Sequence, residues 1–224
     1  MEQSHIPVLK EEVQHWMQAQ SGKTYVDGTL GLGGHASMLL EDSAPEGVLL
    51  GIERDPRNLR VAQARLEVFG DRARLVRGNY ADLKQILHEN NIHRVDGVLL
   101  DVGFSSVHVD DPTRGFSFLK EGPLDMRYDL DQALTAELVV NSWSEADLAD
   151  AFILYGEEKR AQPMAHAIVR RRSVRPFHTT TDLAETIAAA FGKHGKVHPA
   201  TRVFQALRIV VNDELGALRR VLPD

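Results

Sequence analysis

The sequence predicts a doubly wound α/β fold, in which a parallel sheet carries helices on both faces. Two observations predict it. The first hundred residues alternate short β-rich segments with helical segments. The β-rich segments are continuous apolar runs, which is typical of strands buried on both faces. Because parallel strands must be joined by a crossover, the helical segments fit as right-handed crossovers between them.

The individual elements follow from these patterns. We expect strands at residues 24–29, 48–53, 74–79 and 95–102, and helices between them at about 34–42, 56–69 and 81–91. The alternation stops after Asp101. Residues 104–130 form a loop rich in Gly, Pro and Asp, and a loop of this length is usually either functional or disordered.

Helical patterns follow the long loop. Ser142 and Glu145 have the spacing of a capping box before a helix that Gly156 closes. Thr181 or Asp182 can cap a further helix that ends near Gly192. Pro199 can lie in the first turn of the last helix.

The last helix carries one apolar stripe, and we expect it to pack back on the sheet. The stripe consists of Val203, Leu207, Val211, Leu215, Leu218 and Leu222. The predicted domains are therefore residues 1–107 for the first part of the α/β domain, 108–195 for an inserted all-helical domain, and 196–224 for the returning helix.

Length and composition exclude several classes of protein. The chain has 224 residues, of which 43% are hydrophobic and 26% charged, and this composition does not fit a disordered, collagen-like or coiled-coil chain. The sequence has no Cys, which excludes disulfides, thiolate nucleophiles and Cys-ligated zinc. It shows no signal peptide and no apolar run long enough for a membrane span, so we expect a cytoplasmic protein with no membrane partner.

The net charge of −6 hides an asymmetry along the chain. Residues 1–150 hold 14 Lys and Arg against 25 Asp and Glu, whereas residues 151–224 hold 12 against 7. The densest basic run consists of Arg170, Arg171, Arg172 and Arg175. Such a run is either a solvated face or a phosphate-binding surface, and the charge pattern alone leaves both readings open.

The sharpest local motif is DGTLGLGGH at residues 27–35, where a predicted strand gives way to a predicted helix. Glycines let the main chain approach a ligand closely, and a helix start offers unpaired N–H groups. Gly31, Gly33 and Ala36 satisfy the loose G-x-G-x-x-A dinucleotide fingerprint, and Glu53 follows 20 residues after Gly33. We therefore expect a nucleoside cofactor here, with a tight structural turn as the alternative.

Two carboxylates distinguish between the cofactors. Asp27 and Asp101 stand at the ends of the first and fourth predicted strands, at the edge where ligands bind in such folds. A carboxylate beside the diphosphate of NAD is repulsive, whereas a cationic sulfonium amino acid suits it. This favours S-adenosyl-L-methionine over NAD, although both Asp residues could also serve as turn or capping residues.

Eight ordered blocks then resemble the family of bacterial small-subunit rRNA (cytosine-N4)-methyltransferases, RsmH or MraW. The blocks cover nearly the whole chain: HIPVL (5–9), DGTLGLGGH (27–35), ERDP (53–56), DVGFSS (101–106), RGFSF (114–118), GPLDMR (122–127), YGEE (155–158) and HPATRVFQALRI (198–209). The resemblance implies a class I S-adenosyl-L-methionine-dependent methyltransferase of Rossmann-like fold, with an inserted helical domain that helps to recognise RNA. It implies that the substrate is one cytidine in the decoding centre of 16S rRNA, whose exocyclic N4 amine is methylated.

Carried over by position, the resemblance implies a set of cofactor contacts. They are Gly33, Gly34 and His35 at the glycine turn, Glu53 at the ribose, Tyr80 against the adenine, and Asp101 and His108 near the mouth of the site. The family commonly has Asp, Phe and Gln where this chain has Glu53, Tyr80 and His108. The first two exchanges keep an acceptor and a ring, whereas the third replaces an amide by an imidazole.

The chemistry of the amine suggests which groups act on it. Cytosine N4 is a poor nucleophile, so the site must accept one amino hydrogen and align N4 with the methyl group. Asp101 is the candidate acceptor with Ser105 in support, and a loop carbonyl is the alternative. Phe104, Phe116 and Phe118 either stack on a flipped base or pack in the core. The sulfonium is already electrophilic, so we expect no metal site.

With an RNA substrate implied, Arg170, Arg171, Arg172 and Arg175 become candidate phosphate contacts, and the implied partner is 16S rRNA or the small ribosomal subunit. The family continues into further strands where this sequence stops, which predicts missing C-terminal strands and an open fourth strand in the order 3-2-1-4. We expect either a truncated enzyme or a second chain on that edge, as in a homodimer. The alternative functions are a noncatalytic remnant that binds RNA or cofactor and, more remotely, an NAD-dependent oxidoreductase.

Overall fold

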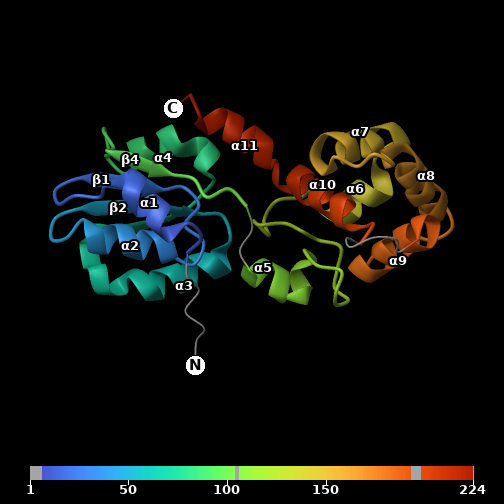
Figure 1. The fold of residues 1–224 in the computed structure, drawn as a ribbon, viewed down its shortest axis with the longest axis horizontal. Helices are drawn as coiled ribbons and strands as arrows, with labels where there is room; N and C mark the ends of the chain where they lie inside the picture. Colours follow the sequence, from blue (N-terminus) through green and yellow to red (C-terminus); the bar gives the residue numbers. More distant parts are fainter. Residues whose placement is uncertain (1–6, 104–105, 193–197, 224) are drawn as a thin grey trace. The chain divides into compact units, whose positions relative to one another are not determined.

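In the computed structural model, residues 7–103, 106–192 and 198–223 are described, and the chain divides into two compact units (Figure 1). The sheet unit comprises Met1–Gly103 and Leu215–Asp224, and the helical unit comprises Phe104–Glu214. The helical unit is therefore an insertion in the sequence of the sheet unit, because the chain leaves the sheet unit once and returns to it once.

Four parallel strands form the centre of the sheet unit. They are β1 (Thr24–Asp27), β2 (Val48–Glu53), β3 (Ala73–Arg77) and β4 (Gly97–Leu99). Their order is β3-β2-β1-β4, and every neighbouring pair is parallel. The predicted α/β fold class and strand order are confirmed. β1 and β4 end earlier than predicted, so residues 28–29 and 100–102 belong to the loops at the carboxyl ends of the strands.

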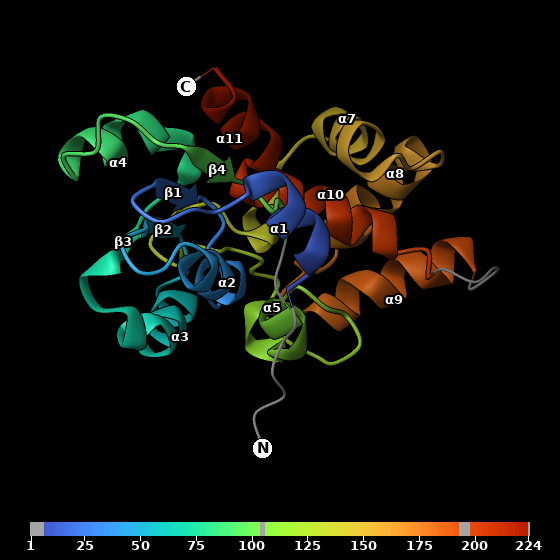
Figure 2. The same ribbon diagram turned by 60° about the vertical axis from the view of Figure 1, so that its left-hand side comes forward.

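Helices cover both faces of this sheet (Figure 2). They are α1 (Lys10–Met17), α2 (Gly34–Asp42), α3 (Pro56–Leu66), α4 (Leu83–Glu89) and α11 (Glu214–Val221), with short 3-10 turns η1 (Glu67–Arg72) and η2 (Tyr80–Asp82). Tyr25 and Leu49 pack with α1, α2 and α3, whereas Val26 and Leu50 pack with α4 and α11. This alternation follows from the strand geometry, because successive side chains point to opposite faces.

The helical unit has a core of its own. Its elements are α5 (Ser106–Asp110), η3 (Pro112–Arg114), α6 (Ala136–Ser142), α7 (Glu145–Gly156), α8 (Ala161–Arg172), α9 (Thr180–Phe191) and α10 (Thr201–Asn212). Buried apolar side chains from α6 to α10 form one continuous cluster. The helices α7 and α10 lie very close, since a Cβ atom at Gly156 would come within 2.5 Å of a main-chain oxygen of α10.

Side-chain caps fix where several of these helices begin, and two predicted caps are wrong. Ser144, and not Ser142, caps α7 by accepting the N–H of Asp147 at 3.1 Å. Thr179, and not Thr181 or Asp182, caps α9. Ser142 donates to a carbonyl in its own helix α6 instead. The predicted ends at Gly156 and near Gly192 are confirmed.

The long loop after α5 is part of the packed unit and is not disordered. Gly115 has a φ of +72°, and a Cβ atom at Gly122 would lie only 1.8 Å from a main-chain oxygen of the same loop. The buried side chain of Asn212 accepts the N–H of Tyr128 at 2.8 Å and donates to the carbonyl of Met126 at 2.7 Å. These contacts bind the loop to α10.

The predicted last helix is two helices. Asp213 takes the left-handed conformation with a φ of +48°, which ends α10 before α11 begins. Val203, Leu207 and Val211 pack in the core of the helical unit, whereas Ala217 and Val221 pack under the sheet. The expectation of a helix returning to the sheet thus holds for α11 only. Compared with the predicted insertion at 108–195, the compact helical unit extends to Glu214 because it includes α10.

Candidate active site

The glycine turn connects β1 to α2 at the carboxyl end of the sheet. Gly31 and Gly33 have φ values of +54° and +78°, in a region of backbone conformation that residues other than glycine rarely adopt. Gly33 is the residue before the first turn of α2, and its own N–H donates to Leu30 O at 2.8 Å. The turn therefore directs the start of α2, with its unpaired N–H groups, toward the strand ends.

Gly28 is enclosed by the neighbouring loops. A Cβ atom at Gly28 would lie 2.6 Å from the Leu100 side chain and 3.1 Å from Cβ of Tyr80. Tyr80 is itself buried in the core of the sheet unit, where it opens η2. The predicted adenine contact thus lies next to the glycine turn.

Asp27 is the most unusual group at this edge. It is 1% exposed, and its Oδ1 accepts the N–H of Thr29 at 3.1 Å. Its Oδ2 is buried without a hydrogen-bond partner. Burial raises the pKa of Asp27 to about 6, opposed by the hydrogen bond from Thr29 and by His35, and reinforced by the nearby Asp101. An ionised Asp27 therefore lacks a positively charged or N–H partner for one oxygen.

Glu53 ends the neighbouring strand β2. Burial raises its pKa to about 7, although main-chain N–H groups of Asp55, Gly31 and Arg54 lower it by donating to the carboxylate. The bond from Asp55 N–H is 2.8 Å long. The link to Gly31 brings Glu53 against the glycine turn, as the spacing of 20 residues in the sequence predicts.

Asp101 follows β4 and is exposed. Its main-chain N–H donates to Oγ1 of Thr29 at 2.7 Å, so the loop after β4 is attached to the loop after β1. The N–H of Thr29 in turn donates to Oδ1 of Asp27 at 3.1 Å, so Thr29 contacts both acidic residues. Asp27, Glu53 and Asp101 thus gather at one edge of the sheet, as predicted.

His35 has a contact that the sequence did not reveal. It is buried, and its Nε2 lies 2.8 Å from the carbonyl oxygen of Val8. Gly34 also faces this N-terminal segment, since a Cβ atom there would lie 2.9 Å from Pro7. In the structure, Gly34 and His35 hold the segment before α1 against the start of α2.

The remaining predicted site residues lie in the helical unit or outside the described residues. His108 is buried in α5, with its ring centroid 5.0 Å from that of Phe116 and 5.1 Å from that of Tyr128. Phe118 packs against Phe204, and both Phe116 and Phe118 are partly buried against the core of the helical unit. Ser105, together with Phe104, lies outside the described residues.

The basic run, whose first three residues end α8 and whose fourth, Arg175, follows it, contains two kinds of side chain. The guanidinium of Arg171 forms two bonds to Asp182, of 2.5 and 2.6 Å, and lies over the ring of Phe177. Arg172 donates to main-chain oxygens of Val140 and Trp143. Arg170 is exposed, and Arg175 is 70% exposed although its guanidinium lies 3.4 Å from Asp182. Arg171 and Arg172 therefore hold the helical unit together, which the run of charges could not show.

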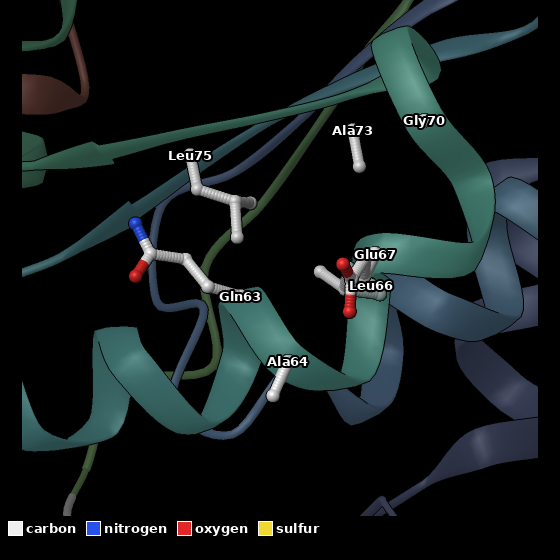
Figure 3. Close-up of a pocket in the computed structure, with 7 residues that line it drawn as sticks. All are labelled: Gln63, Ala64, Leu66, Glu67, Gly70, Ala73 and Leu75. Atoms are coloured by element: carbon white, nitrogen blue, oxygen red, sulfur yellow. The ribbon is translucent and has the colours of Figure 1, made fainter.

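A hollow of about 480 Å³ lies elsewhere in the sheet unit, between α3, η1 and β3 (Figure 3). It is lined by Gln63, Ala64, Leu66, Glu67, Gly70, Ala73 and Leu75. Ala73 is the first residue of β3 and pairs with Leu49 near the start of β2. The hollow is thus nearer to the amino ends of the strands, whereas the glycine turn lies at their carboxyl ends.

The described residues contain neither a membrane-spanning helix nor a cluster of metal ligands. No helix in the described part of the chain is both long and apolar enough to cross a bilayer. Within residues 7–103, 106–192 and 198–223, no three His, Asp or Glu side chains come together in a way that could hold a metal ion.

Comparison with known proteins gives one consistent result. The model of the MraW methylase family matches residues 2–224. A protein of Syntrophus aciditrophicus named "Ribosomal RNA small subunit methyltransferase H" is 48% identical over 223 residues, which cover 98% of this chain and 71% of that protein. Proteins with the same name from Geotalea uraniireducens and Desulfotalea psychrophila are 48% and 44% identical, over 97% and 100% of this chain and 71% and 77% of theirs.

The match extends over both units, and the glycine turn with its carboxylates lies within it. A methylase family requires a methyl donor, and this family implies S-adenosyl-L-methionine. The chain belongs to the MraW methylase family.

Proposed function

We propose that this chain methylates the exocyclic N4 amine of a cytidine in the decoding centre of 16S rRNA, with S-adenosyl-L-methionine as the donor. Family membership and the name shared by the relatives support methylation of small-subunit rRNA. The acceptor is free 16S rRNA or the small ribosomal subunit, and we expect the protein to act in the cytoplasm, where that substrate is made. The NAD-dependent oxidoreductase alternative does not fit a methylase family.

The observation that carries the proposal is the buried Oδ2 of Asp27, which has no hydrogen-bond partner. A buried carboxylate oxygen without a donor is costly, and an ammonium group satisfies it. S-Adenosyl-L-methionine supplies a methyl group on an electrophilic sulfonium and carries such an ammonium. Asp27 would bind this ammonium, because its burial leaves the carboxylate exceptionally short of positive charge.

Other residues at the same edge suit the rest of the donor. Glu53 would accept the ribose hydroxyl hydrogens, since its carboxylate stands at the end of β2 beside the glycine turn. Gly33 and Gly34 would let the main chain approach the donor without a side chain between them. Tyr80 offers a ring next to Gly28 for the adenine, and His35 fixes the start of α2.

Asp101 is the proposed acceptor for a hydrogen of the amine. It is exposed at the end of β4, close to Asp27, so one carboxylate would hold the donor and the other would orient the acceptor. A hydrogen bond from the amine to Asp101 would pull electron density toward N4 and fix its direction of attack. Ser105 in support of Asp101, and His108 as a further cofactor contact, stay predictions.

For RNA binding, the exposed side chains of Arg170 and Arg175 are the better candidates for phosphate contacts. Arg171 and Arg172 would contribute mainly by holding α8 in place, because their guanidinium groups already bind protein oxygens. Homodimer formation stays a prediction.

Methyl transfer tests the proposal directly. The whole chain is incubated with radiolabelled S-adenosyl-L-methionine and with 16S rRNA or small subunits from a strain lacking this modification. We expect label in one cytidine, recovered as N4-methylcytidine after digestion. Asp101→Asn should lower transfer roughly 100-fold, and calorimetry with S-adenosyl-L-methionine measures how much of this loss lies in donor binding. The exposed Asp71 provides the matched control Asp71→Asn, which should keep full activity.

Absence of transfer to both substrates, with S-adenosyl-L-methionine bound, would favour the noncatalytic alternative. Calorimetry with NAD in parallel separates the two cofactors, and binding of NAD alone would overturn the choice of donor.

A further inference from the structure

Thr29 connects the two acidic loops of the site. Its N–H donates to Oδ1 of Asp27 at 3.1 Å, and its Oγ1 accepts the main-chain N–H of Asp101 at 2.7 Å. Oγ1 also lies 3.5 Å from Oδ1 of Asp27, at the limit of a hydrogen bond. One half-buried side chain therefore touches the residue proposed to hold the donor and the residue proposed to orient the acceptor.

The hydroxyl continues the strand pairing after the strands have ended. β1 and β4 pair in register up to Asp27 and Leu99, and Gly28 N–H still donates to Leu99 O at 2.9 Å. The next link is the side chain of Thr29, whose oxygen takes the N–H of Asp101. The Thr29 hydroxyl thus takes the place of a main-chain carbonyl in the next hydrogen bond between the two chain segments.

This link lies where the chain starts to leave the sheet unit. Asp101, Val102 and Gly103 are exposed, and Gly103 is the last residue of the sheet unit before the helical unit begins. An exposed stretch has few packing contacts to restrain it. A short hydrogen bond to the main chain of Asp101 therefore has a large share in fixing where this residue, and with it the base of its carboxylate side chain, lies.

We propose that Thr29 is a positioning residue for the transfer reaction, whose hydroxyl holds Asp101 at a fixed distance from Asp27. The inference rests on the proposed function, because it assigns Asp27 to the donor and Asp101 to the acceptor. Threonine suits the task since its branched Cβ restricts the side-chain rotamer more than that of serine. Valine keeps this shape and removes only the hydroxyl.

The role predicts a separation between kcat and KM. In Thr29→Val, the main-chain N–H still donates to Asp27, so KM and Kd for S-adenosyl-L-methionine should stay within about threefold of wild type. The N–H of Asp101 loses its acceptor, and displacement of a reacting group by about 1 Å can lower the rate roughly 100-fold. We expect kcat for the rRNA substrate to fall between about 10-fold and 100-fold.

Two further variants separate positioning from general damage. Thr29→Ser restores the hydroxyl and should recover most of kcat. Thr24 begins the same strand at its opposite end, and Thr24→Val provides a matched control that should transfer methyl groups at the wild-type rate. Melting temperatures of all variants are compared so that any loss of folded protein is visible.

Each outcome has a distinct meaning. If wild type transfers no methyl group, the proposed function fails and Thr29 is not at issue. If wild type is active and Thr29→Val keeps full kcat, the positioning role is wrong. An equal loss of kcat in Thr29→Val and Thr29→Ser would also overturn it, because the hydroxyl would then be irrelevant. A large rise in KM for the donor at unchanged kcat would place Thr29 in donor binding instead.

Discussion

Two carboxylates of the sheet unit differ from two carboxylates of the helical unit in how their charge is compensated. In the helical unit, charges are paired within the protein: Asp125 with Arg127 at 2.8 Å, and Glu214 with Arg208 at 2.8 Å. Hydrogen bonds from Arg127 lower the pKa of Asp125 despite its partial burial. In the sheet unit, burial raises the pKa of Asp27 and of Glu53, because main-chain N–H groups compensate only part of the desolvation.

This difference distinguishes charges that stabilise a fold from charges kept for a ligand. A fully paired carboxylate has little left to offer a cofactor, whereas a buried carboxylate with an unsatisfied oxygen gains most from a cation. The incompletely compensated carboxylates lie beside the glycine turn of the sheet unit, so we expect the ligand to bind there.

The largest expected effect is that of Asp27→Asn. The amide cannot provide a negative charge to the ammonium of the donor, so affinity for S-adenosyl-L-methionine should fall roughly 100-fold by calorimetry. The free variant should also be more stable than wild type at pH 8, by up to about 3 kcal/mol for the shift of the Asp27 pKa from 3.8 to about 6. Urea unfolding measures this difference.

The sign of the stability change follows from linkage. A carboxyl whose pKa is raised in the folded state contributes stability that is complete below pH 3.8 and is lost as the pH rises through about 6. The advantage of Asp27→Asn over wild type should therefore grow from pH 4 to pH 6 and then level off. A stability difference that does not depend on pH would show that Asp27 is not the buried carboxylate described here.

The second effect tests the helical unit. Arg171→Met leaves Asp182 without its bidentate partner, and the pair is only 23% and 21% exposed. We expect a loss of about 2 kcal/mol in the free energy of unfolding, between the values typical of exposed and buried pairs.

Arg170→Glu with Arg175→Glu forms the contrasting variant, because both side chains are exposed. The free energy of unfolding should stay nearly unchanged, whereas RNA binding should weaken. The slope of the logarithm of the affinity against the logarithm of the salt concentration should correspond to about two fewer released counterions. If this double variant binds RNA like wild type, α8 is not a phosphate-binding surface.

The smallest effect is the pH dependence of donor binding. Asp27 must be ionised to hold the ammonium, and burial raises its pKa in the free protein to about 6. Protonation of Asp27 alone should therefore lower the affinity for S-adenosyl-L-methionine about tenfold between pH 8 and pH 5. Glu53, with a pKa raised to about 7, should begin the decline at a higher pH. A flat profile between pH 5 and pH 8 would contradict both assignments.

The sheet unit was predictable because its signals are local. Continuous apolar runs predicted the strands, and the glycines together with Glu53 predicted the edge of the sheet at which a ligand would bind. The break between α10 and α11 was not predictable in this way, since one apolar stripe runs through both helices. Only the tertiary structure shows that Val211 and Ala217 pack in different cores, with Asp213 in the left-handed conformation between them.

The site shows the same limit. The sequence indicated Asp27, Glu53 and Asp101 because the residues that end parallel strands meet at one edge. The bond from Asp101 to Thr29 spans 72 residues, and no spacing rule indicates which side chain completes it. Arg171 and Arg172 look like Arg170 in the sequence, and only Asp182, Val140 and Trp143 distinguish them.

In the proposed function, Asp27 and Glu53 bind the two parts of the donor that the reaction leaves unchanged, its amino acid end and its sugar. Demethylated cofactor, S-adenosylhomocysteine, keeps both. The contacts that bind S-adenosyl-L-methionine would therefore also bind S-adenosylhomocysteine. We expect strong product inhibition and a turnover rate limited by the release of S-adenosylhomocysteine.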